Sequence, residues 1–423
     1  MFVYVVPGSN RRGKVINVPE TVISALSEAR NRHNDPLAVF IYDLAALRGH
    51  ISKMMAALPD GVELYYAIKA NSEVRILNAL SPFVDGFEVS SGGEIERLEK
   101  IGSRKPFIFS GPGKLNSDLC RALKYKDCTI HVESLNEIAR LERFAREARR
   151  VQPVFIRINP QLPSQITSKL AMAGTATPFG IDESELAEAV SRVDNASHLV
   201  LKGFHIHAMS HQQNTQRHQE LMAYYLQQWP DWKALSKNPL YITHLNVGGG
   251  IGVNYLSQEQ FNWSGFCTTL GALLADCDDR PIIRFEPGRF ISAFCGYYAI
   301  EVLDQKISHG KGFLICRGGT HQFRLPAAQG HDHPVIHLPQ QAERDVTPQS
   351  WTVVGQLCTP KDILSRDCLF SGVKSGDILL LPLAGAYGYN ISHVDFLCHP
   401  HPEMIFLTEE KLPDGTGNIL RCV

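Results

Sequence analysis

The stretch Val62-Glu63-Leu64-Tyr65-Tyr66-Ala67-Ile68-Lys69 is a short apolar run that ends on a lysine, and seven further strand-like runs follow it. Segments of helical character separate the runs, and Thr215–Ala234 is one of the longest. Strands that alternate with helices indicate a parallel sheet. The seven further runs are Phe87–Ser90, Phe107–Ser110, Thr129–Glu133, Val154–Asn159, Leu201–His207, Thr243–Val247 and Ile282–Glu286.

The number and spacing of these runs favour one fold class. Eight β/α units in about 240 residues predict a closed (β/α)8 barrel, whose usual size is about 250 residues. An open doubly wound sheet is the alternative, but Tyr66-Ala67-Ile68-Lys69-Ala70-Asn71 stands where its Gly-rich fingerprint is expected. We therefore expect an α/β protein with a TIM-type barrel over residues 46–284. After about residue 290, short strands alternate with turns, so residues 1–45 and 285–423 are expected to form a mainly β domain of sandwich or barrel type.

Composition excludes several functional classes. The 423 residues include 42 Lys and Arg and 43 Asp and Glu, for a formal net charge of −1, which argues against nonspecific nucleic-acid binding. No apolar run approaches the roughly 18 to 20 residues needed to cross a bilayer. The ten cysteines form no CxxC pairs, which indicates reduced thiols in a cytoplasmic protein. We therefore expect neither a nucleic-acid nor a membrane partner.

Lys69 stands at the C-terminal end of the first predicted strand, on the face where barrel enzymes gather their catalytic groups. Its apolar and aromatic neighbours would partly desolvate the amine and lower its pKa, which favours Schiff-base chemistry. An ordinary exposed lysine at a strand end is the alternative, and it is the favoured one when this residue is considered alone.

Two later motifs have the character of an anion site. Gly248, Gly249 and Gly250 would let backbone N–H groups approach an anion, although a plain tight turn explains them about as well. In Glu286-Pro287-Gly288-Arg289, the guanidinium could bind a phosphate and the carboxylate a protonated ring nitrogen. A mutual ion pair is the alternative for this second motif, but it does not explain the rigid Pro-Gly between the charges.

The run Phe204-His205-Ile206-His207-Ala208-Met209-Ser210 places two histidines on the same side of a predicted strand. No third ligand stands at a recognisable spacing, so we predict no metal site. An amine, an anion site, a carboxylate and a flat histidine together fit pyridoxal 5′-phosphate. A glutamate that keeps the pyridine nitrogen protonated makes the ring a strong electron sink, which favours decarboxylation over racemisation.

At these residues the sequence resembles the fold-type III pyridoxal-phosphate decarboxylases, which include ornithine, arginine and diaminopimelate decarboxylases, and the resemblance covers nearly the whole chain. It implies that Lys69 binds the cofactor covalently and that Cys358 protonates the product carbanion from the partner subunit of a homodimer. A structural cysteine is the alternative for Cys358. The cofactor-binding residues implied by the resemblance are Lys69, His207, Ser210, Gly248, Gly249, Gly250, Glu286, Gly288, Arg289 and Tyr387.

Departures from the family pattern bear on the substrate. Diaminopimelate decarboxylases carry a Glu just after the Cys, where this chain has Thr359, and the acidic residue that ornithine-type enzymes use is not found in Cys316–Pro326. Arg324 matches an arginine that binds a substrate carboxylate, and Asp362 closes the Cys loop as a second expected substrate contact. An acidic distal group is therefore more plausible than an amine.

The stretches Arg317–Pro326, Gly355–Asp362 and Ile391–Glu403 are most similar to the siderophore-assembly branch of the family, of the staphyloferrin B type. That branch converts citryl-diaminopropionate to citryl-diaminoethane and CO2. A diaminopimelate or basic amino-acid decarboxylase, acting on ornithine, arginine or lysine, is the alternative within the same class. A non-catalytic pyridoxal-phosphate-binding regulator is an alternative of another class, although it would not need Lys69, Glu286 and Cys358 together.

Overall fold

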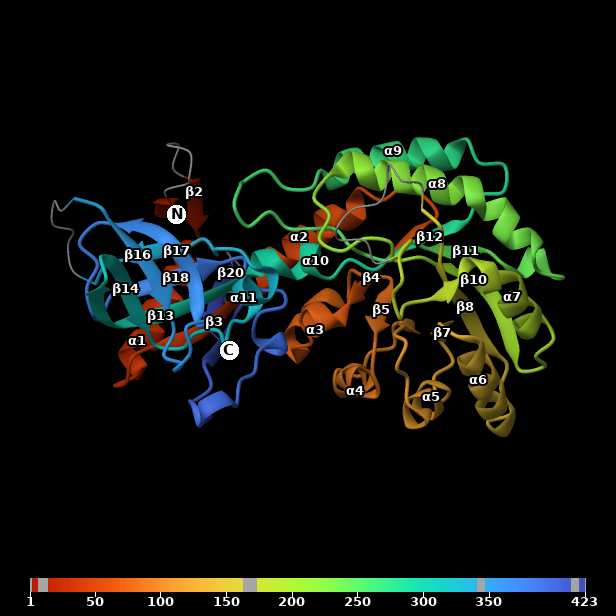
Figure 1. Cartoon of the computed structure of the whole chain (residues 1–423), viewed down its shortest axis with the longest axis horizontal. Coiled ribbons are helices and arrows are strands. Elements are labelled where there is room, and N and C mark those ends of the chain that lie inside the picture. Colours follow the sequence, from red (N-terminus) through yellow and green to blue (C-terminus); the bar gives the residue numbers. More distant parts are fainter. Residues whose placement is uncertain (1, 7–13, 163–172, 341–346, 412–417, 423) are drawn as a thin grey trace. The chain divides into compact units, whose positions relative to one another are not determined.

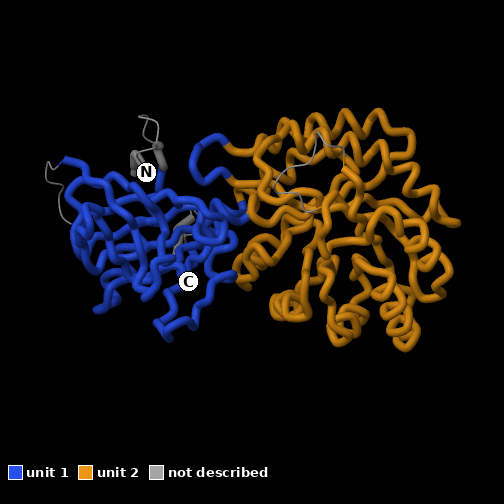
Figure 2. The backbone as a smooth tube through the Cα atoms, viewed as in Figure 1, with its two compact units in different colours: residues 1–48, 254–259, 292–423 blue, residues 49–253, 260–291 orange. Residues whose placement is uncertain are grey.

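The computed structural model describes residues 2–6, 14–162, 173–340, 347–411 and 418–422. The chain divides into two compact units, which Figure 2 shows in different colours. We call the first the barrel unit, which comprises Gly49–Val253 and Gln260–Ile291. The β unit comprises Met1–Arg48, Asn254–Glu259 and Ser292–Val423.

The barrel unit contains a closed ring of parallel strands. Each strand pairs with the next in chain order, and β12 pairs with β4 to close the ring, so the predicted (β/α)8 barrel is confirmed (Figure 1). A short ninth strand, β9 (Ile181–Asp182), extends from the end of β8. The strands of the ring are β4 (Val62–Ala67), β5 (Gly86–Val89), β6 (Phe107–Phe109), β7 (Cys128–Val132), β8 (Gln152–Asn159), β10 (Leu199–His205), β11 (His244–Asn246) and β12 (Ile282–Phe285).

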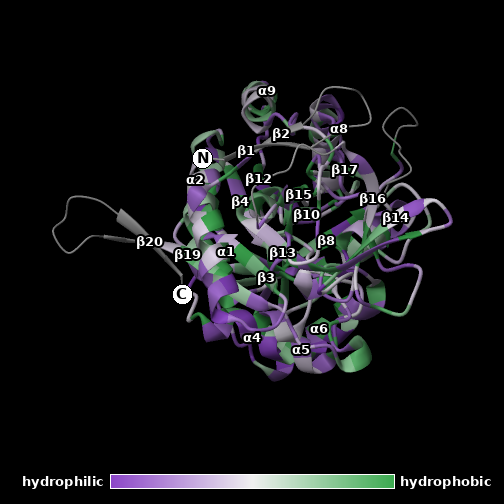
Figure 3. Ribbon diagram, turned by 90° about the vertical axis from the view of Figure 1, so that its left-hand side faces the viewer, coloured by the Kyte–Doolittle hydropathy of each residue, from purple (hydrophilic) through white to green (hydrophobic). Residues whose placement is uncertain are grey.

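The helices between these strands are amphipathic. In α6 (Leu135–Glu147) the residues Ile138, Leu141 and Ala145 are buried, while arginine and glutamate occupy other positions. Figure 3 shows both hydrophilic and hydrophobic residues on the helices of this unit. Helices cover the outer face of a ring whose strands are almost wholly buried, as a parallel sheet requires. The remaining helices around the ring are α2 (Leu44–Ala56), α3 (Val74–Leu80), α4 (Gly92–Lys100), α5 (Asn116–Ala122), α7 (Leu186–Asp194), α8 (Thr215–Ala234) and α9 (Trp263–Ala275).

The limits of the barrel unit differ slightly from the predicted 46–284. The unit begins at Gly49 and continues to Ile291, because the chain after β12 stays bonded to it. The Ala67 N–H donates to the Pro287 carbonyl at 3.5 Å, and His50 Nε2 lies 2.7 Å from the Phe290 carbonyl oxygen. The six residues 254–259 group with the β unit, a detail that the run of strands and helices did not predict.

The β unit is built on an open sheet in the order β17-β16-β14-β13-β3-β19-β20, with β18 also paired to β13 and to β15. The N-terminal strand β3 lies between β13 and β19, so the prediction that the start of the chain completes this domain is confirmed. A separate hairpin joins β1 and β2. The bounds are β1 (Phe2–Val6), β2 (Lys14–Val18), β3 (Ala38–Asp43), β13 (Gly296–Ser308), β14 (Lys311–Cys316), β15 (Ile336–Leu338), β16 (Gln349–Val354), β17 (Ile363–Phe370), β18 (Ile378–Pro382), β19 (Glu403–Lys411) and β20 (Asn418–Cys422).

The core of the β unit lies between this sheet and helix α1 (Glu20–Arg32), which the sequence analysis did not predict. Val22 and Leu26 of the helix pack in one cluster with Val39 and Ile41 of β3 and Leu380 of β18. Because β3 and β18 both pair with β13, the helix covers strands from both ends of the chain.

Two further expectations concern the thiols and the membrane. Nine cysteines are described, from Cys120 to Cys398, and each is a free thiol. The side chain of Cys422 lies outside the described part. Within the described ranges, no helix combines the length and the apolar character needed to cross a bilayer.

Candidate active site

The predicted residues of the barrel unit gather where its strands end. Lys69 lies in a short 3₁₀ turn, Ile68–Ala70, directly after β4. His207 follows β10, the glycine run follows β11, and Glu286 follows β12. Because parallel strands of a barrel present their C-terminal ends on one face, four segments distant in sequence meet there.

The amine of Lys69 has a carboxylate partner that the sequence analysis missed. Lys69 Nζ donates to Glu88 Oε2 at 2.7 Å, and Glu88 on β5 is fully buried. The Lys69 side chain itself is 42% exposed, so it is less desolvated than its apolar neighbours suggested. A nearby carboxylate favours the charged amine, which also opposes the expected effect of desolvation.

The glycine run connects His207 with Glu286. The Gly249 N–H donates to His207 Nδ1 at 3.1 Å, and the Glu286 N–H donates to the Gly248 carbonyl at 2.8 Å. A Cβ atom on Gly249 would lie 2.3 Å from the Glu286 carbonyl oxygen, and Gly248 has a φ of +67°. Glycine is therefore required at both positions by close backbone approach and by a left-handed conformation.

The turn after β12 packs against the turn that carries Lys69. A Cβ atom on Gly288 would lie 2.7 Å from Ala70 Cβ and 3.0 Å from the Ala67 carbonyl oxygen. The absence of a side chain at Gly288 lets the two turns touch. Arg289, at the start of the short helix α10 (Arg289–Ser292), is thereby placed beside the segment of Lys69.

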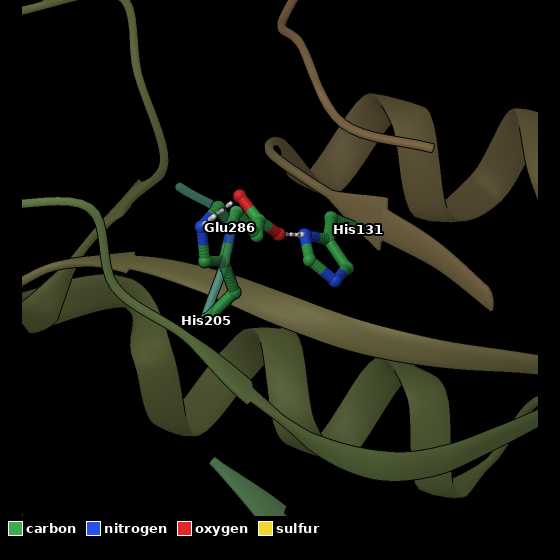
Figure 4. A group of neighbouring side chains, drawn as sticks. All are labelled: His131, His205 and Glu286. Atoms are coloured by element: carbon green, nitrogen blue, oxygen red, sulfur yellow. Dashed lines mark ion pairs between the residues drawn. The ribbon is translucent and has the colours of Figure 1, made fainter. Parts of the chain in front are cut away.

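Glu286 lies in a buried pocket of polar side chains. Its Oε1 accepts a hydrogen bond from Asn246 Nδ2 at 2.7 Å. Figure 4 shows the carboxylate between His131 and His205, whose nearest ring nitrogens lie 3.9 and 3.7 Å from its oxygens. Burial lowers the pKa of both imidazoles well below the ordinary value, so both rings are neutral and these contacts are dipolar.

Burial and the nearby Glu88 raise the pKa of Glu286 to about 7, although Lys69 acts in the opposite direction. A carboxyl group with this pKa can share a proton with a ring nitrogen of similar basicity. Burial, together with the positive charges of Arg157 and Lys69, lowers the pKa of His207, so its ring is neutral as well. The site thus offers a flat neutral ring and a carboxylate able to hold a proton.

Among the described residues, one group of side chains could in principle hold a metal ion, and it consists of His131, His205 and Glu286. His131 Nδ1 is already bonded to Ser110 Oγ at 2.9 Å, and Glu286 Oε1 is bonded to Asn246. Both atoms already take part in hydrogen bonds with protein side chains, and we do not propose a metal site here.

The β unit holds the other predicted residues. Asp362 is buried, and its carboxylate accepts hydrogen bonds from Thr320 N–H at 2.6 Å, Thr320 Oγ1 at 2.8 Å and Leu357 N–H at 2.8 Å. These bonds join the loop of Arg324 to the loop of Cys358, and both of those side chains are exposed. A contact of Asp362 with substrate remains a prediction, since the described bonds give its carboxylate a structural task. Tyr387 has a φ of +51° in a turn after β18.

Comparison with known proteins decides the family. Residues 44–293 match the family model of the pyridoxal-binding domain of pyridoxal-dependent decarboxylases. The chain belongs to this family. Every residue placed above at the ends of the barrel strands falls within the matched range.

Relatives of this decarboxylase cover nearly its full length. It is 38% identical over 398 residues to the 2-[(L-alanin-3-ylcarbamoyl)methyl]-2-hydroxybutanedioate decarboxylase of Staphylococcus aureus, covering 92% of this chain and 99% of that protein. It is 30% identical to the diaminopimelate decarboxylase of Vibrio cholerae, covering 87% of this chain and 86% of that protein. The crystal structure of a mutant diaminopimelate decarboxylase from Helicobacter pylori, complexed with L-lysine, superimposes with a TM-score of 0.80 at 26% identity, covering 94% and 95% of the two chains.

The residues of the barrel unit fit the cofactor that gives the family its name. The side chain of Lys69 is 42% exposed, burial raises the pKa of the Glu286 carboxyl to about 7, and His207 presents a neutral ring beside the glycine run. Both nitrogens of the buried His205 ring lack a hydrogen-bond partner, which indicates that this pocket is built to face a polar group. The Lys69 amine matches the aldehyde of pyridoxal phosphate, the Glu286 carboxyl matches its ring nitrogen, and the His207 ring matches its ring face.

The sequence analysis missed Glu88, His131 and Asn246. A weak signal existed for Glu88, because a carboxylate stood within the apolar run Phe87–Ser90. For His131 and Asn246 the sequence gave no reason to prefer them over other polar residues in strands, since only the closure of the barrel brings them to Glu286.

Proposed function

We propose that this decarboxylase acts in siderophore assembly and converts citryl-diaminopropionate to citryl-diaminoethane and CO2. The observation that carries the proposal is the similarity to the Staphylococcus aureus enzyme over almost the whole of both chains. The name of that enzyme describes a citrate skeleton joined through an amide to C3 of alanine, which is citryl-diaminopropionate.

The loops of the β unit support a substrate with an acidic distal group. The stretch Arg317–Pro326 contains two arginines, one histidine and no acidic residue. The acid of the neighbouring loop, Asp362, is buried and bonded within the loop pair. Arg324 is exposed and able to meet a carboxylate. A distal amine of the substrate would find no free carboxylate in these two loops. The carboxylates of a citryl group would face the arginines of the stretch Arg317–Pro326.

The residues of the barrel unit have distinct tasks in this proposal. Lys69 would hold the cofactor through its amine, His207 would face the cofactor ring, and Glu286 would bind the protonated ring nitrogen. The backbone of Gly248, Gly249 and Gly250 would hold the phosphate together with Arg289, with Ser210 and Gly288 in the same unit. The cofactor contact of Tyr387, a residue of the β unit, stays a prediction from the family resemblance. Bound pyridoxal phosphate supplies the electron sink that lets CO2 leave from Cα.

A substrate panel tests the proposed function. Release of CO2 is measured for citryl-diaminopropionate beside diaminopimelate, ornithine, arginine and lysine. We expect kcat/KM for citryl-diaminopropionate to exceed that for each diamino acid by about 100-fold or more, because the loops offer no carboxylate to a distal amine and would leave it unpaired. Preference for a diamino acid would refute the siderophore assignment, and cofactor binding without turnover of any substrate would favour the regulator.

We further propose that the enzyme is a cytoplasmic homodimer in which Cys358 of one subunit supplies the acid for the partner's site. The exposed thiol of Cys358 is available for such a role. Lys69→Ala and Cys358→Ala subunits, each inactive alone, should regain about a quarter of the wild-type activity per site when mixed at equal amounts, because half of the dimers are mixed and each has one intact site. Heterodimers are isolated with two affinity tags, and no activity in them would place the whole site within one subunit.

A further inference from the structure

His321 is a fully buried histidine of the β unit whose ring nitrogens are unpaired. Neither Nδ1 nor Nε2 has a hydrogen-bond partner among the described residues. Buried polar atoms of folded proteins are nearly always paired, so two unpaired nitrogens on one ring need an explanation. The turn around the ring is firmly held, because the Thr320 N–H donates to Asp362 Oδ1 at 2.6 Å. The Tyr298 hydroxyl also donates to Gln322 Oε1 at 2.8 Å, so loose packing does not explain the unpaired ring.

Two further histidines, on the segment after β18, lie near this ring. The ring centroids of His321 and His399 are 5.2 Å apart, and His393 is close enough to lower the pKa of His321. His393 Nδ1 is a second buried nitrogen without a partner in the described part of the chain. We call His321, His393 and His399 the histidine cluster. His393 and His399 are half-buried, so the cluster has a buried floor and an outer side that meets the solvent.

Gln356 fixes the position of the proton on His399. Its Oε1 accepts hydrogen bonds from the Gly318 N–H at 2.8 Å and from Arg317 Nη1 at 2.7 Å. The amide nitrogen of Gln356 is therefore the atom that donates to His399 Nδ1, at 2.8 Å. Because Nδ1 accepts, the proton of the ring lies on Nε2. His399 thus has an N–H group that can donate to a ligand.

The charges around the cluster suit an anion. Burial lowers the pKa of His321 to about 4, and the next causes are His399, His393 and Arg317, all of them bases. The carboxylate of Asp362, in the neighbouring loop, already accepts three hydrogen bonds within the loops. A carboxylate at the cluster would meet N–H donors and the positive charge of Arg317, which would repel an ammonium group. Among the described residues, the three histidines do not bring their nitrogens close enough together for one metal ion.

The cluster is attached to the two loops that are proposed to meet the substrate. Gln356, the partner of His399, lies two residues before Cys358. The Arg324 N–H donates to Ser392 Oγ at 2.9 Å, and Ser392 directly precedes His393. A second hydrogen bond, from Gln322 Nε2 to the Pro400 carbonyl at 3.0 Å, joins the segment after β18 to the turn of His321.

We propose that the histidine cluster binds a carboxylate of the distal group of the substrate. His393 and His399 contact it from the outer side, and His321 donates to it from the floor. The inference rests on the proposed function, in which the distal group is a citryl group. The outer rings turn aside to admit the carboxylate, a change of rotamer that is common at binding sites. The bound carboxylate then supplies the partner that His321 lacks.

The experiment compares two substrates of the purified holoenzyme that share one amino acid and one amide. Citryl-diaminopropionate has the carboxylates of citrate, and acetyl-diaminopropionate has none. In His399→Ala we expect the ratio of their kcat/KM values to fall about tenfold or more, because a hydrogen bond to a charged group has this order of effect. The loss should lie in KM for the citryl substrate, since the contact is far from the reacting bond, and kcat/KM for the acetyl substrate should not change.

His321→Leu separates a ligand site from a structural role. It removes both unpaired nitrogens, so the substrate ratio should fall as in His399→Ala. The unfolding temperature should not fall, because no described hydrogen bond of the protein is lost. The matched control is His337→Leu, at a side chain that is 8% exposed and whose Nε2 lies 2.8 Å from Asp377 Oδ2. His337→Leu should lower the unfolding temperature and leave the substrate ratio unchanged.

Free citrate gives a second readout. Its inhibition constant, measured with the substrate that the wild-type enzyme decarboxylates fastest, should rise about tenfold in His399→Ala and in His321→Leu. An unchanged substrate ratio, or an equal loss on both substrates, overturns the inference. If acetyl-diaminopropionate is not turned over, the citrate constant decides, and an unchanged constant overturns the inference. Faster wild-type turnover of a diamino acid than of citryl-diaminopropionate overturns the proposed function, and the citrate constant then tests the histidine cluster by itself.

Discussion

Replacement of Lys69 by alanine is expected to abolish covalent attachment of pyridoxal phosphate and to lower kcat for decarboxylation by about 1,000-fold or more. The side chain of Lys69 is accessible at the ends of the barrel strands, and its amine is held by Glu88. Removal of the amine leaves no nucleophile at this position. The measurements are the mass of the borohydride-reduced protein and the rate of CO2 release.

A matched control is Lys100→Ala, at the exposed end of α4, which should keep both the attached cofactor and the full rate. The unfolding temperature of Lys69→Ala should fall below that of the wild-type protein measured without cofactor, because the buried Glu88 carboxylate loses its cationic partner, so both measurements are made at a temperature where the variant is folded. Covalent attachment that persists in Lys69→Ala would show that another lysine carries the cofactor.

Replacement of Glu286 by glutamine is expected to lower kcat about 100-fold, because a positioned charge that stabilises developing charge in a buried site has this order of effect. The carboxyl group, with a pKa raised to about 7 mainly by burial, is able to hold a proton at the ring nitrogen. Glutamine keeps the shape and a hydrogen-bonding group but has no negative charge. The rate of CO2 release and the absorbance of the bound cofactor are the measurements.

Glu137 offers a control of equal burial. It forms an ion pair with Lys114 at 2.9 Å, and the two side chains are 5% and 0% exposed. Glu137→Gln should lower the unfolding temperature, because it leaves a buried lysine without its charged partner, yet leave the cofactor absorbance unchanged. Wild-type kcat in Glu286→Gln would mean that the ring nitrogen does not need a negative partner in this enzyme.

The periodicity of the sequence was sufficient to predict the barrel. Strands buried on both faces read as continuous apolar runs, and their alternation with amphipathic segments indicated a parallel sheet before any contact was known. The β unit was harder, because α1 and strands such as β17 have weaker local signals and depend on partners from distant parts of the chain. The limits of the barrel moved by a few residues because hydrogen bonds after β12, invisible in the sequence, hold residues 287–291 to it.

The candidate site shows the same division. Lys69, His207, the glycine run and Glu286 were predictable because each stands at the end of a recognisable strand, and a (β/α)8 barrel places such ends on one face. Glu88 and Asn246 were not, because their importance comes from distances of 2.7 Å to Lys69 and to Glu286, which close only when the ring of strands closes. For Asp362 the sequence motif indicated a substrate contact. In the folded loops both of its carboxylate oxygens accept hydrogen bonds, from the backbone and hydroxyl of Thr320 and from the backbone of Leu357.

The sequence by itself determined the fold class, the chemistry of the individual groups and the face on which they gather, because periodicity and residue type are local properties of the chain. Only the tertiary structure decided how those groups are paired. The Lys69 amine is paired with a buried carboxylate from the next strand, and the proton affinity of Glu286 depends on burial and on Glu88. Burial and distance set such interactions, and both are properties of the closed barrel rather than of the order of its residues.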